Sequence, residues 1–169
     1  MDAPHGSEYL YFMALVRILV DGYSLLHQWP ELAPGQPRHS ARAREALLEI
    51  LTHYQDAAGT PVTVFFDGSG KVTSAPRDSS APAVEVLFSH AGQTADDLIE
   101  RAAHRFQPYG EVMVVTDDRA ERDTVTGFGG TTSSCANFIR TIGDALDQLA
   151  EDLQRYNRSE RKRFSRGPH

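Results

Sequence analysis

Short apolar runs recur along the chain and alternate with segments in which apolar residues follow helical spacing. Residues 16–20 are rich in β-branched side chains and stop at Asp21, which suits a strand buried on both faces. Similar runs occupy residues 62–66, 84–88 and 112–115, and helical spacing marks residues 40–57, 94–104 and a last segment that begins at Ser133 or Ser134. Strands that alternate with helices predict an α/β domain with a parallel sheet and right-handed crossovers.

Three segments fall outside this pattern. Residues 70–82 are polar and contain several Ser and Pro, which predicts a loop. Residues 155–169 are strongly basic with almost no apolar side chains, so we expect disorder or a frayed helix end. Met13 is a second candidate start, so we expect residues 1–12 to form a flexible extension. The folded domain is expected at residues 13–150, and residues 151–169 form a basic tail.

Composition narrows the class of protein. The 169 residues suit one domain, and the formal net charge of -6 argues against a protein whose main task is to coat nucleic acid. Cys135 is the single cysteine, which excludes an internal disulfide and indicates a reducing compartment, the cytoplasm. The apolar run that ends at Val20 is too short to span a bilayer and contains Arg17, so we expect no membrane segment.

Acidic residues collect at the ends of the predicted strands. The carboxyl ends of parallel strands share one edge of a sheet, so these side chains are expected in one pocket. Carboxylates at such short distances repel each other, and a bound Mg²⁺ or Mn²⁺ would relieve the repulsion. A metal site of this kind favours hydrolysis of phosphodiester bonds. Each acid alone also suits a turn or a helix cap, and their coincidence favours the metal site. They are Asp21, Asp67, Asp96, Asp97, Asp117 and Asp118.

Other chemistries lack their signatures. The chain has no phosphate-binding loop that ends in Gly-Lys-Ser or Gly-Lys-Thr, and no Gly-x-Ser-x-Gly elbow of a serine hydrolase. A phosphatase that forms an aspartyl-phosphate needs an Asp-x-Asp pair, whereas Asp21 is followed by Gly22 and Tyr23. Cys135 fits a small buried residue better than a nucleophile.

Several motifs together resemble those of NYN domains, relatives of the PIN nucleases, in their YacP-like branch. The segment VDGYS at residues 20–24 resembles a D-G-Y-N opening, TADDLIE at 94–100 resembles T-A-D-D-x-I-E, and VVTDD at 114–118 resembles V-V-T-S-D. Residues 29–32 and 44–51 also match, and the resemblance spans about 16–142. It implies a PIN-like three-layer α/β/α sandwich around four to five parallel strands, and metal-dependent endoribonuclease activity on messenger RNA at the ribosome.

The resemblance assigns roles to the residues that match its motifs, and the expected position near the site assigns roles to the others. Asp117 falls where the family has serine and is therefore an additional acid. Asp21, Asp96, Asp97 and Asp118 are the predicted catalytic residues, and Asp21, Asp97, Asp117 and Asp118 are the predicted ligands of Mg²⁺ or Mn²⁺. Ser24, Asp67, Thr94 and Thr116 are expected to support the site, and Tyr23, Arg38, Arg42, Arg44 and Ser134 to bind substrate. The three arginines equally suit a solvated helix face.

Two departures from the family pattern keep a second hypothesis open. Ser24 stands where the family has asparagine, and Thr132 replaces an expected arginine that would hold a phosphate. A non-catalytic adaptor that recognises RNA or the ribosome with the same pocket is therefore the alternative. The expected partners are single-stranded or messenger RNA and the ribosome, with the chain as a monomer or a weak homodimer. The basic tail suits either a contact to RNA or a solubilising end.

Overall fold

The computed structural model describes residues 15–68 and 84–167. The predicted loop at 70–82 and the predicted extension at 1–12 lie outside the described residues. The elements are β1 (Leu15–Asp21), α2 (Gly22–Gln28), η1 (Pro30–Leu32), α3 (Ala41–Ala58), β2 (Val62–Phe66), β3 (Glu85–Phe88), α4 (Ala95–Phe106), η2 (Gln107–Tyr109), β4 (Glu111–Val115), α5 (Arg119–Gly127), β5 (Thr131–Ser133) and α6 (Cys135–Ser165).

Five parallel strands form one sheet in the order β3-β2-β1-β4-β5. The predicted α/β class and parallel sheet are confirmed, and the four predicted strands correspond to β1, β2, β3 and β4. From β1 the chain moves outward through β2 and β3, and then returns to place β4 on the other side of β1. The strand order therefore reverses between β1 and β4, which is where open parallel sheets place their binding sites.

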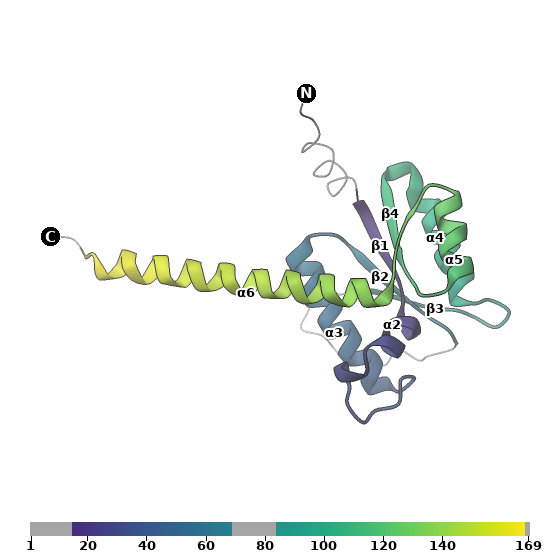
Figure 1. Cartoon of the computed structure of the whole chain (residues 1–169), viewed down its shortest axis with the longest axis horizontal. Coiled ribbons are helices and arrows are strands. Elements are labelled where there is room, and N and C mark those ends of the chain that lie inside the picture. Colours follow the sequence, from purple (N-terminus) through teal and green to yellow (C-terminus); the bar gives the residue numbers. More distant parts are fainter. Residues whose placement is uncertain (1–14, 69–83, 168–169) are drawn as a thin grey trace.

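Helices cover both faces of the sheet and make three layers (Figure 1). Successive side chains of a strand point to opposite faces, so Ile18 and Val20 pack under α2, α3 and α6, whereas Leu19 packs under α4 and α5. Both faces of the central strands are buried, which explains why β1, β2 and β4 are continuous apolar runs. Phe138 and Ile142 of α6 belong to the first core, and Ile99 of α4 belongs to the second.

Gly22 joins β1 to α2 without any loop residue. A Cβ atom at this position would lie 2.3 Å from the Phe66 ring, so any larger residue would displace that buried ring or the start of α2. The missing side chain lets α2 begin immediately after the strand, and the Asp21 carboxylate caps it by accepting a hydrogen bond from the Ser24 amide at 3.3 Å. The position of Asp21 is therefore fixed by both the strand and the helix.

The last helix corrects one expectation. Residues 155–165 were expected to be disordered or frayed, but α6 continues through them to Ser165. Arg, Lys, Glu and Gln are good helix formers, so a helix that is nucleated on the core can continue without further packing. Figure 1 shows α6 leaving the body of the molecule and ending far from it. Within the described ranges, none of the helices has the length and apolar character needed to cross a bilayer.

Candidate active site

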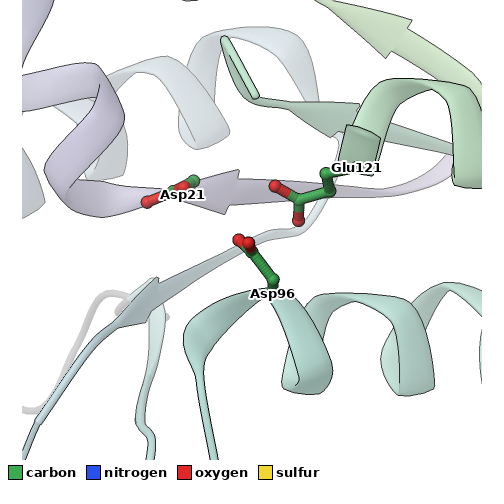
Figure 2. Close-up of side chains that lie close together, drawn as sticks. All are labelled: Asp21, Asp96 and Glu121. Atoms are coloured by element: carbon green, nitrogen blue, oxygen red, sulfur yellow. The ribbon is translucent and has the colours of Figure 1, made fainter. Parts of the chain in front are cut away.

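Three carboxylates meet at the carboxyl edge of the sheet, where the strand order reverses. Asp21 ends β1, Asp96 lies in the first turn of α4, and Glu121 lies in the first turn of α5. One carboxylate oxygen from each residue lies within 4.8 Å of the other two. Figure 2 shows the three side chains close together on separate elements, with the carboxylates of Glu121 and Asp96 facing each other and Asp21 beside them at the end of β1. We call these three residues the inner acidic cluster.

Glu121 is the most buried member, with 3% of its surface exposed. Burial is the main cause that raises its pKa to about 8, and the neighbouring Asp96 carboxylate raises it further. The Thr116 hydroxyl lies close enough to lower the pKa and offset part of this rise. The carboxyl therefore holds a proton at neutral pH unless a cation neutralises it.

Asp21 and Asp96 are perturbed in the same direction. Burial raises the pKa of Asp21 to about 6, hydrogen bonds from Ser24 lower it, and the charges of Asp96 and Asp67 raise it. The pKa of Asp96 is also raised, first by desolvation and then by neighbouring carboxylates. Three acids that resist ionisation together are the electrostatic signature of a site that gains from positive charge.

The oxygens of Glu121 provide a direct test of whether a cation fits. Both are buried, and neither has a hydrogen-bond donor among the described residues at normal hydrogen-bond geometry. A buried polar group without a partner costs about 1–3 kcal/mol, and more when it is charged. A divalent cation prefers such oxygen ligands, so the donor set of the inner acidic cluster fits Mg²⁺ or Mn²⁺.

The remaining predicted acids hold the surrounding helices in place. The Asp118 carboxylate accepts from the Glu121 amide at 3.2 Å and begins α5, and Asp117 accepts from the Cys135 amide at 2.9 Å at the start of α6. Asp97 forms a reciprocal capping box with Thr94, with both hydrogen bonds at 3.1 Å. These acids therefore position the backbone around the cluster.

Asp67 connects β2 to the same edge. Its Oδ1 accepts from the Ala95 amide at 2.6 Å, which fixes the start of α4 and hence the position of Asp96. The charges of Asp67, Asp97 and Asp118 all raise the pKa of Asp96, so these acids lie near the cluster. The structure thus brings the predicted acids to one edge and divides them into an inner group and a surrounding group.

Glu121 was missing from the predicted set. The segment 119–127 has few apolar residues, so its hydrophobic pattern did not mark it as a helix. A second signal was present, because Asp118 and Glu121 have the acceptor-x-x-Glu spacing that is typical of a helix start. That spacing would have predicted α5 and would have placed Glu121 one turn from the end of β4.

Four of the five predicted substrate-binding residues lie on α2, on α3 or on the segment between them. Tyr23 packs on Phe66 and His39, with ring centroids 4.9 and 4.4 Å away, and its hydroxyl accepts from Arg44 at 3.4 Å. Arg38 contacts the His27 ring. Arg42 is exposed.

Three further predicted residues have structural contacts. The Ser134 hydroxyl caps α6 by accepting from Asn137, and the Thr116 hydroxyl accepts from the Asp118 amide. Trp29, which belongs to the matching segment 29–32, is partly buried and packs against the core.

Cys135 is buried at the start of α6. Burial and the Asp117 carboxylate raise the pKa of its thiol to about 12, so the sulfur stays protonated. This environment agrees with the prediction that the residue is a small buried side chain, because an activated nucleophile needs a lowered pKa.

A parallel sheet flanked by helices on both faces, with carboxylates gathered where the strand order reverses, defines a PIN-like α/β domain. The family model of the YacP-like NYN domain matches residues 18–167. The chain therefore belongs to the YacP-like NYN domain family, which confirms the resemblance found in its motifs.

Known relatives agree with this assignment. YacP of Bacillus subtilis (strain 168) is 29% identical over 126 residues, which cover 74% of each chain. The crystal structure of a single-substitution variant of Rae1 (YacP) from Bacillus subtilis is similar with a TM-score of 0.69 and 25% identity, covering 84% of both chains. A second crystal structure of Rae1 (YacP) has the same TM-score at 24% identity, over 86% of this chain and 83% of that one, and shows the shared fold.

Proposed function

We propose that this protein is an endoribonuclease that depends on Mg²⁺ or Mn²⁺ and hydrolyses phosphodiester bonds of RNA in the cytoplasm. The observation that carries the proposal is the inner acidic cluster, in which three carboxylates from three elements converge within 4.8 Å. The two buried oxygens of Glu121, which lack a donor at normal hydrogen-bond geometry among the described residues, support a cation there. Membership of a PIN-like nuclease family supports the reaction.

Asp21, Asp96 and Glu121 are the proposed metal ligands. A bound divalent cation would supply an activated water and would offset charge on the leaving oxygen. Asp21 is held in place by the Ser24 amide, and Asp96 by the start of α4, which Asp67 fixes. The side chains are therefore positioned before any substrate arrives, so little rearrangement is needed in the reaction.

The surrounding acids have a positioning role in this proposal. Asp97, Asp117 and Asp118 fix the first turns of α4, α6 and α5, and the negative charges of Asp97 and Asp118 act on Asp96. Through those helix starts they determine where the inner carboxylates point. We assign them to the site as supports, together with the hydroxyls of Thr94 and Thr116.

The substrate is proposed to approach over α2 and α3. Arg38, Arg42 and Arg44 supply positive charge on this side, and Arg44 is held by the Tyr23 hydroxyl and the carbonyl of His39. An arginine that is fixed in this way can pair with a phosphate with less loss of side-chain entropy. Single-stranded RNA, including messenger RNA on the ribosome, is the proposed substrate of this enzyme.

Cleavage of a labelled single-stranded RNA in the presence of Mn²⁺ tests the proposal. We expect Glu121→Gln to lower the cleavage rate by about a hundredfold or more, because the amide keeps the shape and removes the charge that binds the cation. Asp123→Asn is the matched control, since Asp123 is an exposed acid on the same helix. Wild-type rates in Glu121→Gln would contradict the proposed site.

The same assay separates the nuclease from the adaptor. The adaptor is favoured by Ser24 and Thr132, the two positions at which the chain departs from the pattern of its family. If the wild-type protein binds RNA and Mn²⁺ but cuts neither free RNA nor messenger RNA on translating ribosomes, the adaptor is the correct function. Mn²⁺ binding measured by calorimetry, lost in Glu121→Gln and kept in Asp123→Asn, would locate the cation site in either case.

A further inference from the structure

The end of α6 concentrates positive charge in a chain that is acidic overall. Residues 155–166, which we call the distal arm, contain six cationic residues and one acid, whereas the whole chain has a formal net charge of -6. The preceding part of α6, residues 143–154, contains four acids and no cation. The polar surface of one continuous helix thus changes from negative to positive at residue 155.

Most of these cations have no acidic partner among the residues that the structure describes. Arg155 lies 4.0 Å from Glu151 and Arg163 lies 3.5 Å from Glu160. The other four have no ion pair within 4.0 Å in the described part of the chain; they are Arg158, Arg161, Lys162 and Arg166. The charge of the arm is therefore available to a ligand.

Stabilisation of the helix does not explain where all of these cations lie. Arg155, Arg158 and Lys162 follow each other at three- and four-residue spacing, so they share one face of the helix, and Arg166 comes directly after its end. The helix dipole favours cations only within about the last turn. Since α6 ends at Ser165, the dipole does not explain Arg155 and Arg158, which lie further back.

Two exposed aromatic side chains accompany the cations. Tyr156 is 62% exposed and Phe164 is 83% exposed. When a positively charged surface binds the phosphate backbone of a single-stranded nucleic acid, exposed aromatic rings beside it allow the bases to stack on them. The arm therefore combines the two features of sequence-independent single-strand binding, namely phosphate neutralisation and stacking.

We infer that the distal arm binds single-stranded RNA through its phosphates, at a second contact separate from the inner acidic cluster. The arm begins 20 residues after the start of α6, which corresponds to about 30 Å at 1.5 Å per residue. Figure 1 shows this end of α6 far from the sheet. The arm would thus hold a part of the strand remote from the scissile bond, and only the choice of RNA as the polymer rests on the proposed function.

Two other occupants fit the arm less well. Apolar residues at 149, 153 and 156 have the spacing of a coiled-coil seam, but the next seam positions are Glu160 and Arg163, so pairing with a second copy would end before the arm. A helix that lies on an anionic membrane needs an apolar face along its length. The arm offers only Tyr156 and Phe164 for such a face.

Fluorescence anisotropy of a labelled single-stranded RNA, titrated with the full chain in EDTA over a series of salt concentrations, tests the inference. We compare Arg158→Gln/Lys162→Gln with the control Arg101→Gln/Arg105→Gln. Both pairs are exposed cations four residues apart on a helix, and both variants lose the same charge. Each phosphate contact to a single strand contributes about 0.7 to the slope of log K against log salt.

The arm variant should therefore reduce that slope by about 1.4 and weaken binding roughly 25-fold at 0.1 M salt, whereas the control should keep the wild-type slope. Circular dichroism checks that glutamine, a good helix former, leaves the helix intact. Equal slopes in the two variants would overturn the inference. So would binding to phosphatidylglycerol vesicles without binding to RNA, or a dimer by sedimentation that excludes RNA. Because EDTA stops cleavage, a failure here is distinct from a failure of the nuclease assay.

Discussion

The inner acidic cluster and the distal arm carry charges of opposite sign, and the cluster is buried whereas the arm is exposed to solvent. In the cluster, three carboxylates are crowded together at the edge of the sheet, and burial raises the pKa of each. In the arm, six cations extend into solvent on a helix that has left the core. A buried charge without a partner requires a counter-ion at one fixed position. An exposed charge stays hydrated at little cost in free energy, and it can bind a charged polymer at many positions along the polymer.

The largest expected effect tests whether the inner and surrounding acids differ. Asp96 and Asp97 are neighbours in the sequence, but Asp96 points into the cluster and Asp97 forms the capping box. We expect Asp96→Asn to lower Mn²⁺-dependent cleavage by about a thousandfold. Asp97→Asn should lower it by about tenfold or less, because a weakened cap costs only about 1 kcal/mol of stability. Equal losses in the two variants would remove the distinction.

The dependence of stability on pH gives the next largest effect. The folded-state pKa values of Asp21 and Glu121, about 6 and about 8, lie above their ordinary values of 3.8 and 4.5. Between these limits the folded state binds more protons than the unfolded state, so stability must fall as pH rises from about 4 to 8. Without metal, the loss should amount to several kcal/mol by pH 8, since each pKa unit is worth about 1.4 kcal/mol and solvent screens part of this energy.

Thermal unfolding in EDTA, followed from pH 5 to pH 8, measures this loss. Glu121→Gln cannot ionise, so its melting temperature should vary less with pH than that of the wild type. Mn²⁺ should restore the stability of the wild-type protein at pH 8 and leave the variant unchanged. A melting temperature in EDTA that rises from pH 5 to pH 8 would contradict the electrostatic description of the cluster.

Substitutions at two glycines should have the smallest effects, and they should change the stability of the fold in opposite directions. At Gly22 a Cβ atom would meet the Phe66 ring at 2.3 Å, whereas at Gly143 in α6 an added Cβ would have no neighbour within 4 Å in the described part of the chain. Gly22→Ala should destabilise the fold by about 1–3 kcal/mol through overpacking. Gly143→Ala should stabilise it by about 1 kcal/mol, because alanine favours a helix. Chemical denaturation of both variants measures the difference, and stabilisation by Gly22→Ala would show that the close approach is not required.

The parts of the fold that bury apolar residues could be predicted from the sequence. The runs that became β1, β2 and β4 are β-branched and continuous, since both faces of the sheet are covered. In contrast, β5 consists of Thr131, Thr132 and Ser133, which have no apolar pattern and form a strand only because β4 offers an unpaired edge. Short α2 escaped notice because it begins inside the motif that follows β1.

The site was predictable to the level of the sheet edge and no further. Parallel topology brings the acids that follow each strand to one place, which the sequence pattern could show. Which oxygens meet depends on helix starts that are fixed by hydrogen bonds such as those of Asp67 and Asp118. Glu121 enters the cluster because α5 turns it inward, and a pattern of hydrophobic residues carries no information on that rotation. The roles of the individual acids remain predictions.

The buried thiol at the start of α6 has a practical consequence. Cys135 is the single cysteine of the chain, fully buried, and its pKa is raised to about 12. Maleimide dyes react with thiolates, so the native protein should resist labelling at neutral pH. A cysteine introduced by Ser165→Cys, on the exposed last turn of the helix, would then be the one position that takes up a fluorophore. The protein can therefore be labelled at a single introduced cysteine for single-molecule spectroscopy without first removing its own cysteine.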